Sequence, residues 1–81
     1  MNMERAAMRG LLAEKKERSA QLRLRIQGTG STIRAGLNTA LNPVDDLEIP
    51  MLAAQMDELV MAWGELQALL ADIARLEREL A

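Results

Sequence analysis

The sequence contains no cysteine, histidine, phenylalanine or tyrosine among its 81 residues. Without cysteine or histidine the chain cannot form a disulfide, a thiolate nucleophile, a zinc site of the Cys/His type or an imidazole proton relay. A carboxylate-only site for magnesium or calcium stays open, but no pattern supports one. We therefore expect no cofactor and no metal, and we predict that the protein is not an enzyme.

Long hydrophobic runs are also missing, because charged residues interrupt every apolar stretch before it reaches the roughly 18 residues of a membrane span. The first 16 residues lack the layout of a signal peptide for the same reason. A soluble, cytoplasmic protein without membrane contact is the expectation. So short a chain buries only about 60% of its unfolded surface, so association with a partner is the expected source of further stability.

The residues that are present favour helices. Hydrophobic residues make up 49% of the chain, but they are mostly leucine, alanine and methionine, and Trp63 is the only aromatic residue. β-Branched residues are few. This composition predicts an all-α protein.

Glycine and proline divide the chain into predicted elements. Gly28 and Gly30 predict the end of a first helix, Ser31 is suited to begin a short helix, and Pro43 ends it. Pro50 is tolerated in the first turn of a last helix. The predicted fold is a single domain, 1–81, forming an antiparallel helical hairpin: helix about 2–27, linker 28–30, short helix about 31–42, turn 43–49 and long helix about 50–81.

The last helix carries apolar residues at alternating spacings of four and three, the repeat of a coiled-coil seam. The predicted buried seam and interface consists of Leu52, Met56, Leu59, Trp63, Leu66, Leu70 and Ile73. The first helix has an interrupted apolar stripe and cannot cover all of this face. We therefore expect a coiled-coil-like bundle formed by oligomerisation, as a homodimer, a higher oligomer or a complex with another helical protein.

The two ends of the chain carry opposite charge. Residues 1–27 hold seven basic and three acidic residues, a balance of +4, whereas residues 45–81 hold nine acidic and two basic residues, a balance of −7. In an antiparallel hairpin this division places Arg23 and Arg25 near Asp57 and Glu58, the cluster 15–18 near Glu65, and the basic residues Arg5 and Arg9 near Asp72 and Glu77. The same basic helix is the alternative candidate for nucleic-acid contacts, through Lys15, Lys16, Arg18, Arg23 and Arg25. Because Glu14 and Glu17 interrupt it and no aromatic residue accompanies it, internal charge pairing is the favoured interpretation.

One segment suggests ligand binding. Gly28-Thr29-Gly30-Ser31 before a helix could cradle an anion on backbone N–H groups, but no strand precedes it and the P-loop lysine is absent. A helix-breaking linker is the favoured interpretation.

The overall outline permits two further comparisons. A helical hairpin of this length with prolines near its centre, Pro43 and Pro50, resembles the filament subunits of bacterial type III secretion needles, although their turn has a tighter Pro-x-x-Pro spacing. Small helical proteins of bacteria and phages share the outline. The sequence thus predicts a non-catalytic interaction, adaptor or structural module, with a nucleic-acid-binding regulator and a filament or secretion-type subunit as alternatives.

Overall fold

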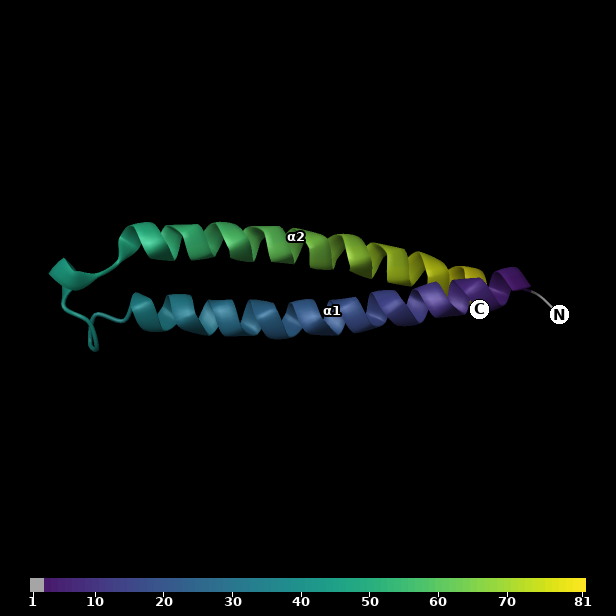
Figure 1. The fold of residues 1–81 in the computed structure, drawn as a ribbon, viewed down its shortest axis with the longest axis horizontal. Helices are drawn as coiled ribbons and strands as arrows, with labels where there is room; N and C mark the ends of the chain where they lie inside the picture. The colour runs from purple at the N-terminus through teal and green to yellow at the C-terminus, as the bar shows by residue number, and fades with distance from the viewer. Residues whose placement is uncertain (1–2) are drawn as a thin grey trace.

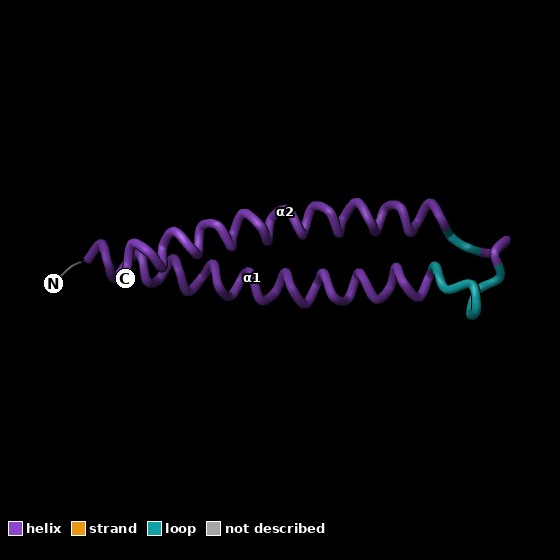
Figure 2. Tube along the Cα trace, turned by 180° about the vertical axis from the view of Figure 1, so that it is seen from behind, coloured by secondary structure: helices purple, strands orange, loops and turns teal. Residues whose placement is uncertain are grey.

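The structure, a computed structural model, describes residues 3–81 and consists of two long antiparallel helices. Helix α1 spans Met3–Gly36, a 3₁₀ turn, η1, spans Val44–Asp46, and helix α2 spans Ile49–Leu80. The helices lie side by side with the chain ends together at one end of a rod of 65 × 16 × 15 Å (Figure 1). The turn closes the opposite end, as the view from behind also shows (Figure 2). The predicted all-α helical hairpin is confirmed.

Helix α1 continues through the predicted linker, so the break at 28–30 and the separate short helix at 31–42 are wrong. Neither Gly28 nor Gly30 has a positive φ, and the Thr32 hydroxyl donates a hydrogen bond of 3.0 Å to the Gly28 carbonyl oxygen across the expected break. Glycine inside a helix costs only about 1 kcal/mol relative to alanine. Ile26, before the two glycines, and Ile33, after them, are half-buried against α2, and these contacts offset the cost of glycine in the helix. Asn2, the predicted first helical residue, lies outside the described residues.

Asparagine side chains help to end α1 and shape the turn. The Asn42 side-chain amide donates to the carbonyl oxygens of Ala35 at 2.9 Å and Asn38 at 3.1 Å, which satisfies acceptors at the helix C-terminus. The Asn38 side-chain oxygen accepts from the backbone N–H of Ala40 at 2.9 Å. At the end of α1, a Cβ built on Gly36 would lie 2.6 Å from a Leu52 methyl carbon. The absence of a side chain there lets the two helices approach closely beside the turn.

The two helices contact each other along positions spaced alternately three and four residues apart. Within α1 these buried or half-buried positions are Arg5, Met8, Leu12, Lys15, Ser19, Leu22, Ile26, Thr29, Ile33 and Gly36. Within α2 they are Leu52, Gln55, Leu59, Ala62, Leu66, Leu69, Ile73, Leu76 and Leu80. Leu22 is 1% exposed and packs in a core cluster with Ala62 and Leu66. We call these two rows together the seam.

The predicted seam of α2 consists of two columns, each a row of residues spaced seven apart along one side of the helix. The observed seam contains the first column, Leu52, Leu59, Leu66 and Ile73, but not the second, Met56, Trp63 and Leu70. Leu52, Leu66 and Ile73 are buried and Leu59 is half-buried. Met56 and Trp63, predicted to be buried, are 48% and 57% exposed, and Leu70 is half-buried. Ala62 and Leu76 are buried in their place. Apolar residues lie on both sides of the column Leu52, Leu59, Leu66 and Ile73, which the predicted and observed seams have in common. Helix α1 packs against the side that contains Ala62, because this small residue leaves room for Leu22.

Several seam positions are polar. The buried Ser19 donates its hydroxyl hydrogen to the Lys16 carbonyl oxygen at 2.7 Å, so it is satisfied within its own helix. Gln55 has a buried side-chain oxygen with no hydrogen-bond partner among residues 3–81. Because a buried acceptor loses its hydration on folding, this oxygen opposes folding by about 1 to 3 kcal/mol.

Replacement of Gly28 by alanine tests the continuity of α1. A Cβ at Gly28 or at Gly10 meets no atom within 4 Å, and both residues lie inside the helix. We expect Gly28→Ala to raise the free energy of unfolding by about 0.5 to 1 kcal/mol, and we expect the same increase for its matched control, Gly10→Ala. Chemical denaturation followed by circular dichroism measures both. A loss of stability for Gly28→Ala alone would show that the helix ends there in a left-handed glycine.

Replacement of Gln55 tests the unpaired oxygen of the seam. Gln55→Met keeps the length of the side chain and removes the polar group, so we expect the free energy of unfolding to rise by about 1 kcal/mol. Gln67→Met is the control, because Gln67 is exposed and its replacement is expected to change stability by less than about 0.5 kcal/mol. Equal changes in the free energy of unfolding for the two variants would show that the unpaired oxygen of Gln55 does not destabilise the seam.

Candidate interaction surface

An apolar groove runs along one flank of the hairpin in the half nearest the turn. It comprises three adjoining hollows that share Ile33, Leu37, Met56 and Leu59. From α1 it is lined by Ile26, Gly30, Ile33 and Leu37, and from α2 by Ile49, Leu52, Ala53, Met56, Leu59, Val60 and Trp63. Arg34 and Asn38 border it at one edge. We call this set the apolar groove.

The seven-residue repeat explains why these residues gather on one flank. Ile49, Met56, Trp63 and Leu70 follow one another at seven-residue intervals in the column of α2 beside the seam. On α1 the facing column contains Gly30 and Leu37. Because Gly30 has no side chain, nothing from α1 fills the space near it. The absence of a side chain at Gly30 leaves a hollow between α1 and Leu59 of α2.

The exposure of these residues is unusual for large apolar side chains. Val60 and Trp63 are each 57% exposed, and Ile49, Met56 and Leu37 are about half exposed. The hollow between Ile26, Met56, Leu59, Val60 and Trp63 has no polar residue in its lining. Single exposed apolar residues are common on proteins, whereas a contiguous set of them marks an interaction surface.

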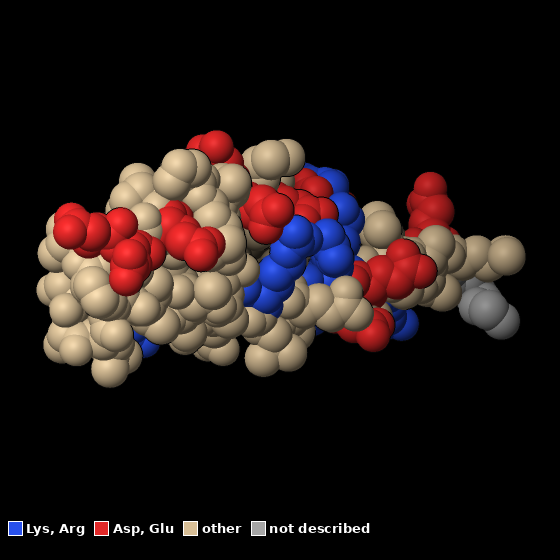
Figure 3. Space-filling model, turned by 60° about the vertical axis from the view of Figure 1, so that its left-hand side comes forward, with Lys and Arg blue, Asp and Glu red and all other residues tan. Residues whose placement is uncertain are grey.

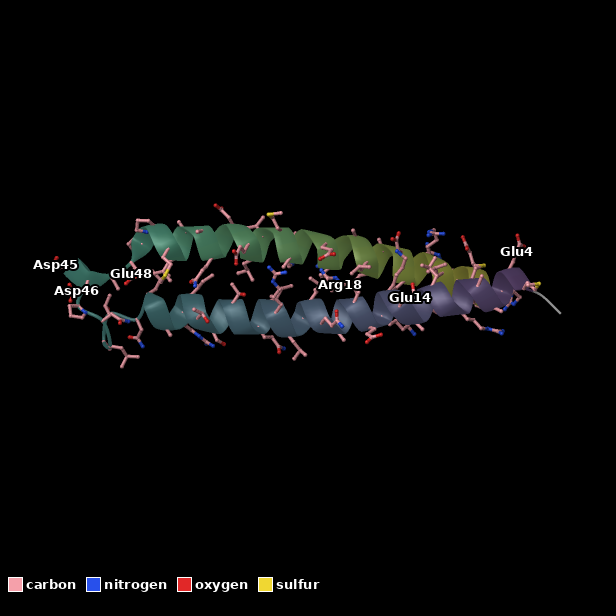
Figure 4. All side chains as sticks on the ribbon, in the orientation of Figure 1. Glu4, Glu14, Arg18, Asp45, Asp46 and Glu48 are labelled. Atoms are coloured by element: carbon pink, nitrogen blue, oxygen red, sulfur yellow. The ribbon has the colours of Figure 1, made fainter. Side chains whose placement is uncertain are left out.

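The other flank carries charge pairs between the helices. Arg18 donates to both carboxylate oxygens of Glu65, with a shortest distance of 2.9 Å, and lies between the two helices (Figure 4). Lys15 pairs with Asp72 at 3.1 Å. Arg25 and Glu58 line a hollow of this flank together but form no ion pair within 4 Å. This flank lacks a contiguous apolar lining.

The observed contacts confirm part of the predicted charge placement and show different ion pairs for the rest. The cluster 15–18 does face Glu65, through Arg18. Arg25 and Glu58 lie in one hollow, as predicted, but form no ion pair, and Asp72 and Glu77 form their ion pairs with Lys15 and Lys16. Arg5 donates to the Leu80 carbonyl oxygen at 2.7 Å. The register differs because α1 continues without a break to Gly36, so residues 28–36 lie along α2 and not in the connection between the helices.

The five basic candidates for nucleic-acid contact are not a free basic patch. Lys15, Lys16 and Arg18 are held in ion pairs with α2, and only Arg23 and Arg25 have no ion pair among residues 3–81. A space-filling view shows the basic side chains gathered in a band with acidic side chains on either side (Figure 3). Acidic neighbours of this kind weaken the field that would attract phosphates.

The proposed anion cradle at Gly28–Ser31 is not formed. These residues lie in the middle of α1, where backbone N–H groups bond to carbonyl oxygens of the preceding turn and no helix begins. Residues 3–81 also contain no group of three or more acidic side chains placed to hold a metal ion. Within the same range, neither helix has the length and apolar character needed to cross a membrane.

The chain has no significant match among protein-family models, curated proteins or solved structures.

A double-mutant cycle tests the charged flank. Because the Arg18–Glu65 pair is half-exposed but bidentate, we expect Arg18→Ala and Glu65→Ala to show a coupling energy of about 0.5 to 1 kcal/mol in unfolding experiments. Arg25 and Glu58 lie on the same flank without an ion pair, so their cycle serves as the matched control with coupling near zero. Similar coupling in both cycles would show that general charge balance, not the specific pair, stabilises the hairpin.

Proposed function

We propose that this protein is a non-catalytic interaction or structural module that binds another helical surface in its apolar groove. The contiguous exposure of Met56, Val60 and Trp63 carries the proposal. An amphipathic helix laid into a hydrophobic groove is a recurring mode of recognition, and it needs an open apolar channel of this kind between two helices.

The energetics of the chain support binding. The fully buried residues are few: Ser19, Leu22, Leu52, Ala62, Leu66, Ile73 and Leu76. So small an interior gives little stability, and burial of further apolar surface contributes about 25 cal/mol per Å². A partner in the groove would cover side chains that the hairpin alone leaves in water. Association would thus stabilise the folded state.

The chemistry of the chain supports a non-catalytic role. Its sequence has no histidine or cysteine, which are the commonest general bases and the strongest nucleophiles in proteins. Asp45, Asp46, Asp57 and Glu58 are exposed. Catalytic carboxylates are usually set in an enclosed site that perturbs their pKa, whereas Asp46 and Glu58 line hollows with their side chains exposed, and the apolar groove contains no carboxylate.

The charge pairs weigh against nucleic-acid binding as the main function. A phosphate backbone would have to displace Glu65, Asp72 and Glu77 from their basic partners. It would also meet the acidic α2, which repels it. The interaction surface is apolar, whereas nucleic-acid-binding surfaces are basic and polar.

Site-specific photocrosslinking tests the proposal without assuming the identity of the partner. A photoreactive amino acid replaces Val60 in the groove or, as the control, Leu24, which is 70% exposed on α1 outside the groove. In the protein's native cells we expect a discrete protein adduct from position 60 and none from position 24. The mass of the adduct, measured by gel and mass spectrometry, identifies either the chain itself or another protein. Absence of adducts from both positions, or equal adducts, would refute a groove-specific function.

A further inference from the structure

We infer that the occupant of the apolar groove is a second copy of this chain, packed groove to groove in antiparallel orientation to give a four-helix bundle. This inference rests on the proposed function and adds the identity and the geometry of the partner. It follows from the spacing of the groove residues and from the charges at the two ends of the groove.

The groove is symmetric about Met56. Ile49 and Trp63 lie seven residues before and after Met56, in the same column of α2. Seven residues correspond to about 10 Å of helix. A two-fold axis through Met56 therefore brings the Met56 side chains of the two copies together and places each Trp63 against Ile49 of the other copy. Symmetric homodimers require self-complementary patches of this kind.

The hollow beside Gly30 fits this arrangement. Gly30 belongs to the α1 column that faces Trp63 across the groove, and the space near it is lined by Ile33, Leu37 and Leu59. Because Gly36 lies against Leu52 and Leu22 packs against Ala62 and Leu66, Gly30 lies level with Met56, so in the antiparallel dimer this space lies beside the two-fold axis and faces Met56 of the second copy. Met56, Val60 and Trp63 would then be covered by apolar side chains, which gives them the environment that the isolated hairpin does not provide.

The charges beyond the groove select the antiparallel orientation. At the tip of the hairpin lie Asp45, Asp46 and Glu48 (Figure 4), and none of them forms an ion pair among residues 3–81. At the other end of the groove lies Arg23, seven residues before Gly30 in the same column, which is exposed and has no ion pair in that range. The antiparallel dimer brings the acidic tip of each copy to Arg23 of the other. A parallel dimer would bring the two acidic tips together, where they repel.

The charged flank argues for a closed dimer and against a filament. An open filament needs a second surface complementary to the first on the same molecule. On this hairpin the flank opposite the groove carries the Arg18–Glu65 and Lys15–Asp72 pairs, and its hollow is lined by Arg25, Glu58 and Glu65 as well as Met61, so it offers no second apolar groove. Groove-to-groove packing covers the contiguous apolar groove in a single contact.

Single-cysteine variants test the geometry directly, because the natural sequence has no cysteine. On mild oxidation we expect Met56→Cys to form a disulfide-linked dimer, since the two-fold axis brings these positions within disulfide reach. Ile49→Cys and Trp63→Cys should each link poorly alone and link efficiently when the two proteins are refolded together. Met61→Cys is the control, because Met61 is 76% exposed and lines a hollow of the other flank.

Charge reversal tests the orientation in solution. Sedimentation equilibrium of the unmodified protein should give about twice 9.0 kDa at micromolar concentration, with Trp63 fluorescence shifting to the red as the dimer dissociates on dilution. Arg23→Glu should weaken the dimer by about threefold to tenfold, and Asp46→Lys in the same chain should restore part of the loss. Arg25→Glu, on the other flank, should leave the dimer constant unchanged.

The results separate this inference from the proposed function. A monomer at about 100 μM, or equal linking by Met56→Cys and Met61→Cys, overturns the second-copy inference. Efficient linking of Trp63→Cys to itself, with none between Ile49→Cys and Trp63→Cys, overturns the antiparallel orientation. If Val60 then gives crosslinks to a different protein in cells, the proposed function stands with another helical partner, and if it gives none, both fail. Circular dichroism of each variant confirms that the hairpin is folded.

Discussion

The packing of Leu22 against Ala62 and Leu66 is the contact on which the rest of the hairpin depends. It lies near the middle of both helices, where the leucine side chain needs a small residue opposite it. This fit sets the rotation of α2 about its own axis. Once Ala62 faces α1, the seven-residue repeat places Leu52, Leu59, Leu66 and Ile73 in the seam and turns the neighbouring column away from it.

The rotation of α2 has a direct consequence for function. The column that contains Met56 and Trp63 is as apolar as a core, but it lies at the edge of the contact between the helices. Larger residues on α1 could cover it, yet Gly30 occupies the facing position. The hairpin thus combines a narrow seam with an uncovered apolar channel beside it. This division of one apolar face between folding and binding is the physical basis of the proposed interaction.

Electrostatics act mainly on register and specificity. The pairs Arg18–Glu65, Lys15–Asp72 and Lys16–Glu77 are partly exposed, so each stabilises the fold by at most about 1 kcal/mol. Together they favour the observed alignment of the helices over neighbouring alignments. The buried oxygen of Gln55 acts in the opposite sense, because its desolvation is not compensated within the hairpin. The seam is therefore adequate for one alignment without being strongly stable.

The sequence by itself determined the helical class, the antiparallel hairpin and the placement of the cluster 15–18 near Glu65, because composition, the seven-residue repeat and the division of charge are local or additive properties. It did not determine that α1 passes through Gly28 and Gly30, since glycine at these positions is compatible with either a helix end or a helix interior. Nor did it determine which apolar column of α2 faces α1. Both columns satisfy the same repeat, and only the tertiary fit of Leu22 to Ala62 distinguishes them, which leaves Met56 and Trp63 exposed in the groove.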